Sequence, residues 1–439
     1  MTHGIGLEMF RWATDLFPIC RSLTGNGVRE TLAYISRIVP ELTVHEVPSG
    51  TQAFDWTVPD EWNIRGAYIE HESGERVVDF ANSNLHVVGY STPVDQWMTL
   101  AELQPYLYSL PEQPDAIPYI TSYYSRRWGF CLSQTQRDGL KEGRYRVVID
   151  STLEPGSLTY GEVLLRGAEE REILLSTYVC HPSLANNELS GPVVTTALCR
   201  WLASLPNRRY SYRIVFIPET IGSIVYISRH LAEMKRRTAA GYVLTCIGDD
   251  RAYSFLRSRE GNTLADRAAK LVMRHHAPDH VEYSYLNRGS DERQYCSPGV
   301  DLPVASIMRT RYQSYPEYHT SLDDLTVVTP TGLEGGFNAV QKVIQLIEGN
   351  RFYKAAYPCE PQLGKRGLYP TLSTRGAGNT VRAMTNLLAY ADGTRDLIDI
   401  AALTGISADE ALDTAARLLE AGLILDLPHA GTHPPSSSD

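Results

Sequence analysis

The sequence predicts an α/β protein that combines a doubly wound sheet with a small mostly-β insertion and a C-terminal helical module. Between residues 161 and 348, short apolar runs that suit buried strands alternate with longer helix-like runs, as expected for a doubly wound sheet. Residues 56–157 differ, because their segments are short, punctuated by Pro and Gly, and rich in Tyr and Trp. Past Gly364 the pattern changes again, to short helices.

Apolar periodicity assigns the individual elements in chain order. Leu7 to Phe17 and Gly27 to Val39 have the spacing of amphipathic helices, and Leu42 to Val47 alternates like a strand. In the insertion, strands are expected at residues 63–70, 76–80, 85–90 and 145–149. In the main domain, strands are expected at residues 163–165, 172–176, 212–217, 240–245 and 304–308, and helices at residues 192–203 and 330–347. Near the C-terminus, helices are expected at residues 386–390, 396–405 and 408–422.

These changes of character predict four parts. The expected division is a main domain of residues 1–55 and 158–360, an insertion of residues 56–157, a winged-helix-like domain of residues 361–428, and a disordered tail of residues 429–439.

The expected winged-helix-like domain resembles a DNA-binding module only in outline. Leu403 to Ser407 resembles the turn of a helix-turn-helix, with Ser407 capping the next helix. Against the single cation Arg417, that helix carries the acidic residues Asp409, Glu410, Asp413 and Glu420. Phosphates repel such a face, so we expect a packing or dimer contact rather than nucleic-acid binding.

Composition excludes several classes of protein. The 439 residues carry a formal net charge of −10, which disfavours nucleic acid as a partner. No apolar run approaches the roughly 18–20 residues of a membrane-spanning helix, and residues 1–12 show no secretory signal. The seven cysteines include no Cys-x-x-Cys pair, which indicates reduced thiols. We therefore expect a cytoplasmic enzyme with a small-molecule substrate and no membrane partner, compatible with a homo-oligomer.

Three segments carry residues suited to metal-assisted hydrolysis. His181 follows an apolar strand and precedes a loop rich in Asn and Glu, which suits a zinc site but also a structural histidine. Glu219 comes directly after a second buried strand, where it serves either as a general base or as a carboxylate at a helix N-terminus. His319 lies in an aromatic loop with Asp323 and Asp324, which are candidates to hold its second ring nitrogen.

Together these segments resemble the di-zinc aminopeptidase clan, whose ligand loops read Asn-Asp-Asn-x-Ser-Gly, Leu-Asp-Met-Val-Gly and Tyr-His-Thr. The chain more closely resembles a bacterial subfamily of aminopeptidase-like proteins labelled as polysaccharide biosynthesis proteins. The resemblance covers nearly the whole chain and is carried by residues 18–25, 54–62, 122–124, 128–131 and 290–294. It implies a doubly wound mixed sheet of the zinc-exopeptidase type, with an inserted β domain and a C-terminal winged helix.

The resemblance also implies a role for individual residues. His181 and His319 fall on metal-ligand positions, and Glu219 falls on the general base. Asn187 stands where the clan has a bridging Asp, so a neutral amide oxygen replaces a stronger carboxylate ligand, and Glu188 is the alternative third ligand.

Two further ligand positions of the clan are occupied by threonines. Thr220 stands where the clan has a second Glu, and Thr245 stands where it has an Asp. These two departures imply one zinc ion rather than two.

Further residues are expected to shape the substrate pocket. Asp291 falls on an Asp that lies near the substrate in the clan, Arg293 is expected to pair with Glu292 beside it, and Tyr315 and Tyr318 belong to the His319 loop.

Arg21 lies in a loop between two predicted helices, where it either binds a substrate carboxylate or caps a helix. Residues 122–124 with Trp128 are candidates for an aromatic wall over the cleft, or else for the core of the insertion. Asp249 and Asp250 are candidates to replace the missing metal ligand.

Three functions are compatible with this pattern. The first is a zinc-dependent, aminopeptidase-like hydrolase of a peptide or amide bond. The second is a biosynthetic enzyme on the same fold that forms or transfers an amide with weakly bound or absent metal. The third is a non-catalytic interaction protein built around the C-terminal module.

Overall fold

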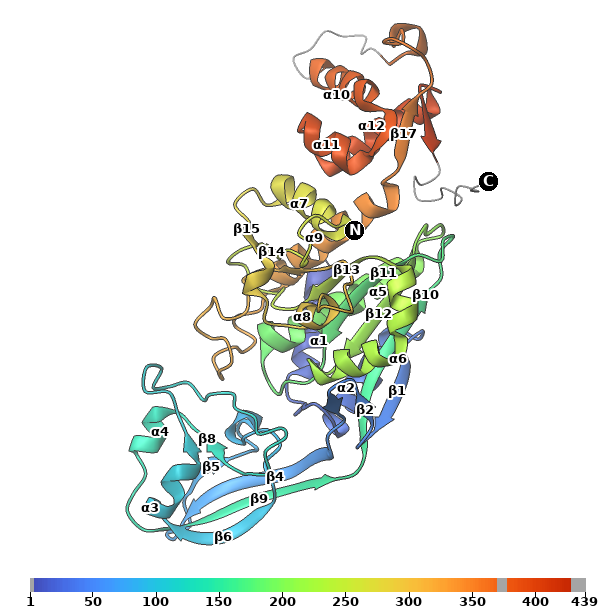
Figure 1. Cartoon of the computed structure of the whole chain (residues 1–439). Coiled ribbons are helices and arrows are strands. Elements are labelled where there is room, and N and C mark those ends of the chain that lie inside the picture. The colour runs from blue at the N-terminus through green and yellow to red at the C-terminus, as the bar shows by residue number, and fades with distance from the viewer. Residues whose placement is uncertain (1–3, 369–376, 428–439) are drawn as a thin grey trace. The chain divides into compact units, whose positions relative to one another are not determined.

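Residues 4–368 and 377–427 are described by the computed structural model, which divides into two compact units. The first unit holds residues 1–261 and 281–337, and the second holds residues 262–280 and 338–439 (Figure 1). The tail expected at residues 429–439 lies outside the described residues. Within the described ranges, no helix is long and apolar enough to cross a membrane.

An eight-stranded mixed sheet forms the centre of the first unit, in the order β1-β10-β12-β11-β13-β16-β14-β15. Its four middle strands run parallel, whereas β10 and β14 pair antiparallel with β12 and β16. The strands span Thr43–Pro48 (β1), Ser157–Leu165 (β10), Ser211–Ile217 (β12), Glu172–Tyr178 (β11), Thr238–Leu244 (β13), Val304–Met308 (β16), Ser254–Leu256 (β14) and Val281–Tyr283 (β15).

Helices cover the two faces of this sheet. Every residue of β11 and β12 is buried, as expected for strands covered on both faces. Helix α5 packs on β11 and against α1 and α2, whereas Ile224 and Val225 of α6 share an apolar cluster with Leu174 of β11. The helices span Ile5–Leu16 (α1), Asn26–Ile38 (α2), Ser190–Ser204 (α5), Ile221–Arg237 (α6), Glu292–Tyr295 (α8) and Pro330–Gly349 (α9). The doubly wound mixed sheet predicted from the sequence is confirmed.

The strand order creates a switch point at the carboxyl end of β11. The chain passes from β11 to β12 on one side and then returns to β13 on the other side. Because the connection that leaves β11 and the one that leaves β12 run in opposite directions, a crevice is expected at the carboxyl ends of these strands. His181 follows β11 and Glu219 follows β12, so both side chains emerge at this edge.

The insertion forms its own four-stranded antiparallel sheet, in the order β5-β4-β9-β6. Since β1 and β10 are neighbours in the main sheet, the insertion returns to the main domain beside the point where it leaves. Its strands span Glu61–His71 (β4), Arg76–Asp79 (β5), Val94–Thr99 (β6) and Arg144–Glu154 (β9). Smaller elements around this sheet are Gln52–Ala53 (β2), Trp56–Thr57 (β3), Leu100–Leu103 (α3), Leu107–Tyr108 (β7), Phe130–Cys131 (β8) and Gln134–Asp138 (α4).

The strand expected at residues 85–90 is not formed. The Ser83 hydroxyl accepts a hydrogen bond from the Leu85 amide and starts a short 3₁₀ turn, Asn84–His86. Beyond it, Val87 and Gly89 make only isolated bridges. A side-chain cap therefore overrides the apolar alternation, which here reflects burial without a strand ladder.

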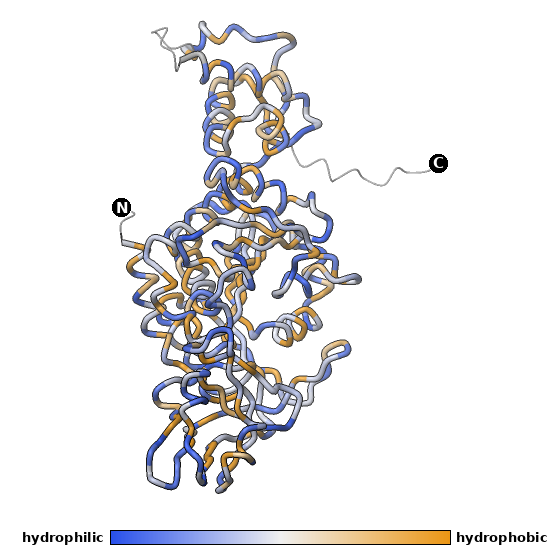
Figure 2. The backbone as a smooth tube through the Cα atoms, turned by 90° about the vertical axis from the view of Figure 1, so that its left-hand side faces the viewer, coloured by the Kyte–Doolittle hydropathy of each residue, from blue (hydrophilic) through white to orange (hydrophobic). Residues whose placement is uncertain are grey.

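The second unit contains the helices and the small sheet of a winged helix. Its elements span Leu264–His276 (α7), Phe352–Ala355 (β17), Ala377–Tyr390 (α10), Asp392–Asp396 (β18), Leu397–Thr404 (α11), Ala408–Glu420 (α12) and Ile424–Leu427 (β19), with sheet order β18-β17-β19. Hydropathy alternates along its helices in Figure 2, as amphipathic helices require. Arg267 of α7 pairs with Asp396 and Asp399 at the start of α11.

Candidate metal and active site

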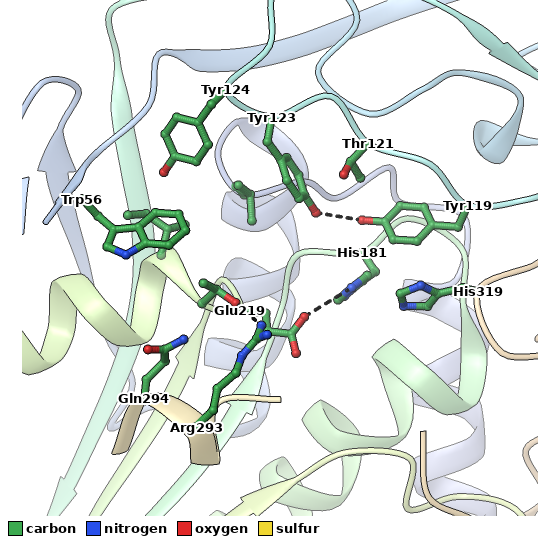
Figure 3. Close-up of a pocket in the computed structure, with 13 residues that line it drawn as sticks. Trp56, Tyr119, Thr121, Tyr123, Tyr124, His181, Glu219, Arg293, Gln294 and His319 are labelled. Atoms are coloured by element: carbon green, nitrogen blue, oxygen red, sulfur yellow. Dashed lines mark hydrogen bonds and ion pairs between the residues drawn. The ribbon is translucent and has the colours of Figure 1, made fainter. Parts of the chain in front are cut away.

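A cavity of about 470 Å³ contains the residues that follow β11 and β12 (Figure 3). Loops of the main domain supply its imidazoles and carboxylate, whereas the insertion supplies most of its aromatic wall. The residues that line it are Leu23, Trp56, Tyr119, Thr121, Tyr123, Tyr124, His181, Glu219, Thr220, Ile221, Arg293, Gln294 and His319.

A buried carboxylate and a buried guanidinium orient His181. Glu188 Oε2 lies 2.8 Å from His181 Nδ1, and Glu188 Oε1 lies 3.3 Å from Arg21 Nε. Arg21 also donates to the carbonyl oxygens of His181 and Leu16, both at 2.9 Å. Burial opposes a charged imidazole, but the hydrogen bond and charge of Glu188 outweigh it and raise the pKa of His181. With Nδ1 engaged by Glu188, Nε2 is the ring nitrogen left for the cavity.

Glu219 stands next to this imidazole. Its Oε2 lies 3.7 Å from His181 Nε2, and its side chain is 21% exposed, so the carboxylate reaches the cavity (Figure 3). Burial raises the pKa of Glu219. The Glu219 amide donates to Cys180 Sγ at 3.2 Å, which ties the ends of β12 and β11 together.

Asp291 holds the turn that aims Glu219. Thr220 has a φ of +64°, which is unfavourable for a β-branched residue. Asp291 Oδ1 accepts hydrogen bonds from the Thr220 amide at 2.7 Å and the Ser223 hydroxyl at 2.9 Å, and these contacts fix the strained turn. Burial and the nearby charge of Glu219 raise the pKa of Asp291 to about 7.

His319 reaches the cavity from the loop before α9. Its ring stacks on Tyr318 at 3.9 Å, and the Tyr119 ring packs edgewise against both His319 and His181. The centres of the two imidazole rings are 5.6 Å apart. Burial lowers the pKa of His319 to about 3, so the ring is neutral at physiological pH. Its Nε2 is buried and has no hydrogen-bond partner among the described residues.

Asn187 contributes a second buried polar atom without a partner. It lies in the single π-helical turn Ala185–Leu189, where Asp323 accepts hydrogen bonds from the amides of Asn186 and Asn187. Asn187 Nδ2 donates to Tyr178 Oη at 2.6 Å, which fixes the side-chain amide. The amide oxygen Oδ1 is left buried, with no hydrogen-bond partner in the described part of the chain. A buried oxygen without a donor is what a cation would satisfy.

The two imidazoles have a spacing compatible with one zinc ion. Zinc–nitrogen bonds of about 2.0–2.1 Å in tetrahedral geometry place two imidazole centres roughly 5–5.5 Å apart, close to the spacing of His181 and His319. A second cation does not fit. The Thr220 hydroxyl accepts a 2.6 Å hydrogen bond from Arg293, whose charge repels another metal, and Thr245 is bonded to Tyr178 and to the Asn187 carbonyl.

Cys180, His181 and Glu188 form a second grouping of metal-binding atoms, all within 4.8 Å of one another and buried. Glu188 Oε2 contacts His181 Nδ1, whereas Oε1 lies 3.3 Å from Arg21 Nε and has no hydrogen-bond partner among the described residues. Burial raises the pKa of the Cys180 thiol well above its usual value, and its sulfur accepts the Glu219 amide. Glu188 therefore orients His181 through Oε2, while its Oε1 stays a candidate for the third ligand.

The structure places the remaining expected residues at different depths. Tyr318 stacks on His319, but the Tyr315 hydroxyl contacts Asp323 beneath the Asn187 turn at 3.1 Å. Arg21 lies behind His181 and does not line the cavity.

The contacts of Arg293 and Asp249 differ from those expected. Arg293 does not pair with Glu292. The Glu292 carboxylate instead accepts hydrogen bonds from the Tyr312 hydroxyl, at 2.8 Å, and from the Gly289 amide. Asp249 is buried, accepts hydrogen bonds from Asn186 and Thr310, and does not line the cavity.

Sequence reasoning missed several cavity residues. Tyr123 and Tyr124 were expected on an aromatic wall and do line the cavity, but Trp128 stacks on Tyr106 at 3.9 Å instead. Tyr119 was not expected, although the Tyr119 amide donates to the His319 carbonyl at 2.8 Å and its ring touches both imidazoles. Pro118, the residue before Tyr119, forms an isolated β-bridge with Thr320. No local feature of the sequence predicts that this segment packs against the His319 loop.

Comparison with known proteins identifies the family of the chain. Residues 10–350 match a family described as a domain of unknown function (DUF4910). The chain belongs to this family. Residues 351–426 match a winged helix-turn-helix family, which confirms the module predicted at the C-terminus.

Two matches from Clostridium acetobutylicum, one a protein sequence and one a crystal structure, cover almost the whole chain. One is provisionally named a polysaccharide biosynthesis protein with an aminopeptidase-like domain, and is 47% identical over 91% of this chain and 92% of its own. The other is a crystal structure provisionally described as a peptidase, with 44% identity, a TM-score of 0.91 and 96% coverage of both chains. The resemblance to this subfamily is therefore confirmed.

More distant structures share the fold. A zinc aminopeptidase from Bacillus subtilis superposes with a TM-score of 0.56 and 12% identity, over 77% of this chain and 94% of its own. A peptidase M28 precursor from Shewanella amazonensis superposes with a TM-score of 0.56 and 13% identity, over 82% of this chain and 95% of its own. The main domain therefore has the fold of zinc aminopeptidases.

Proposed function

We propose that the protein is a mononuclear zinc-dependent hydrolase of a peptide or amide bond in a small substrate. The observation that carries the proposal is the convergence of His181 and His319, 5.6 Å apart, with the Glu219 carboxylate 3.7 Å from the first imidazole. His181 Nε2, His319 Nε2 and Asn187 Oδ1 would hold the ion. The shared fold with zinc aminopeptidases supports the same reading.

The residues of the chain divide the remaining work. Zinc at such a site polarises a carbonyl group and lowers the pKa of water to about 7. Glu219 accepts a proton from the attacking water and delivers it to the leaving amine nitrogen, a role that its raised pKa favours. Arg21 and Glu188 hold the tautomer of His181 that leaves Nε2 unprotonated.

Tyr119 and Tyr123 place a hydroxyl hydrogen in the cavity. Their hydroxyl oxygens lie 3.0 Å apart, so one hydrogen is shared between them and the other remains to donate to a substrate oxygen. Burial raises the pKa of both phenols, which keeps these donors protonated.

Metal analysis with one substitution tests the proposal. We expect about one zinc ion per chain after supplementation, and retention of that zinc in Glu219→Gln. Loss of a general base should lower kcat for amide hydrolysis by about 10²–10⁴-fold. Zinc far below one ion per chain, or unchanged turnover in Glu219→Gln, would overturn it.

A biosynthetic role on the same fold is the second candidate. The name of the 47% identical relative points to polysaccharide biosynthesis, and Asn187 weakens the site relative to a carboxylate. Under this alternative the cavity would form or transfer an amide bond. Amide synthesis from an activated acyl donor and an amine, without hydrolysis of the product amide, would favour it.

A further inference from the structure

Arg293 brings a positive charge into the cavity without a carboxylate in direct contact. Its Nη2 donates to the Thr220 hydroxyl at 2.6 Å, which is a neutral partner. Its Nε is buried and has no hydrogen-bond partner among residues 4–368 and 377–427. The side chain lines the cavity, so one edge of the guanidinium is available to a ligand.

Two buried arginines of the first unit pair with carboxylates, whereas a third, Arg309, donates to the carbonyl oxygens of Ala252 and Gly332. Arg213 lies 2.6 Å from Glu172 and 2.8 Å from Glu162, and Arg21 lies 3.3 Å from Glu188. Arg293 has no carboxylate within ion-pair distance in the described part of the chain, since Glu292 bonds elsewhere. Glu219 and Asp291 interact with the charge of Arg293 from beyond ion-pair distance. A ligand carboxylate would supply the direct, hydrogen-bonded partner that this partly buried guanidinium lacks.

An aromatic pair lies on the same side of Glu219. In Figure 3, Arg293 and Gln294 lie toward Trp56, whereas His181 and His319 lie toward the opposite end of the cavity. Trp56 is 39% exposed and Tyr124 is 51% exposed, and their rings meet edge to face at 5.8 Å. Such uncovered aromatic faces at a cavity suit an apolar or planar group of a ligand.

We propose that the cavity selects small amides that carry a carboxylate, which Arg293 binds while an apolar or planar group rests on Trp56 and Tyr124. The identity of the bond that is cut rests on the hydrolase function proposed above, but the preference for an anion requires no turnover. A guanidinium that donates two hydrogen bonds to one carboxylate combines charge with orientation. The same charge disfavours substrates with a free ammonium group at this end of the cavity.

Three ligands with the same aromatic group and no hydrolysable bond provide the test: 3-phenylpropanoate, 3-phenylpropan-1-ol and 3-phenylpropylammonium. Calorimetric titration of the full chain is expected to show 3-phenylpropanoate binding at least about tenfold more tightly than the other two, equal to about 1.4 kcal/mol. In Arg293→Gln this preference is expected to disappear. Arg126→Gln is the matched control, because Arg126 is an exposed residue of the insertion, paired with Asp60 at 2.7 Å and outside the cavity lining.

The outcomes separate this inference from the proposed hydrolysis. Equal or tighter binding of 3-phenylpropylammonium to the wild-type chain overturns it, whether or not Arg293→Gln folds. A carboxylate preference that persists in Arg293→Gln also overturns it, because the carboxylate then binds elsewhere, for example at a bound metal. The protein could also lack zinc and hydrolytic activity and still show the Arg293-dependent preference. That result would support the carboxylate preference and reject the proposed hydrolase function.

Discussion

Glu188→Gln isolates the buried pair behind His181. Both side chains of the Arg21–Glu188 pair are fully buried, and the substitution leaves the Arg21 guanidinium without its carboxylate. Breaking one partner of a buried ion pair costs about 3–5 kcal/mol, because the remaining charge stays buried and uncompensated. The glutamine amide can still accept from His181 Nδ1, but its NH₂ group then faces Arg21 Nε, which is also a donor. We expect a loss in unfolding free energy in that range.

Tryptophan fluorescence during urea unfolding measures this loss in the relevant unit. All six tryptophans lie between residues 12 and 201, so the signal reports the first compact unit. Asp150→Asn is the matched control, since the Asp150–Arg65 pair is exposed and its removal should change the midpoint little.

A double variant separates the charge pair from other effects. Combining Arg21→Met with Glu188→Gln removes both charges, so the double variant should lose less stability than the sum of the two single variants. Additive losses, or a Glu188→Gln loss no larger than that of Asp150→Asn, would show that the pair does not stabilise this side of the site.

Three other perturbations test the site and the second unit. Asn187→Asp should raise zinc affinity at least about tenfold, because a carboxylate is a stronger ligand than an amide oxygen, and a competition titration with a chelator would measure it. His319→Ala should release zinc in the same assay while far-ultraviolet circular dichroism stays unchanged; full retention would remove His319 from the ligand set. Burial opposes ionisation of Asp396, but hydrogen bonds from Arg267 and Asn350 outweigh the effect of burial and lower the pKa of Asp396. The ionised Asp396 therefore contributes stability above the unfolded pKa of about 3.9, and this contribution is lost as pH falls through the lower folded pKa. Urea unfolding followed by circular dichroism between about pH 5 and 2 should therefore show a smaller acid dependence for Asp396→Asn than for the wild type.

Local periodicity explains why much of the main domain was predictable. Apolar runs such as Ser211–Ile217 form strands that are buried on both faces of the sheet. Because helices must cover both faces, strands and helices alternate along the chain. Polar residues directly after such strands, His181 and Glu219, then have to emerge at one edge of the sheet. Residues 85–90 had the same apolar character but make only isolated bridges, so the pattern alone misassigned them as a strand.

Contacts between distant segments account for what the sequence left open. Arg21 was expected either to bind substrate or to cap a helix, and it donates to the carbonyl of Leu16 at the end of α1, as a helix cap does. Its second contact, with the His181 carbonyl 160 residues along the chain, has no local signal in the sequence. The exposed face of Arg293 likewise depends on Glu292 turning toward Tyr312.

Strand and helix alternation, and the chemical types available at the strand ends, are properties of short stretches of sequence, so reading the chain was sufficient to find them. The packing of Tyr119 against two imidazoles, and the contact of Glu188 with His181, come from the docking of the insertion and of the first helices onto the sheet. Docking is decided by the shape and burial of whole surfaces, which no local pattern of residues encodes.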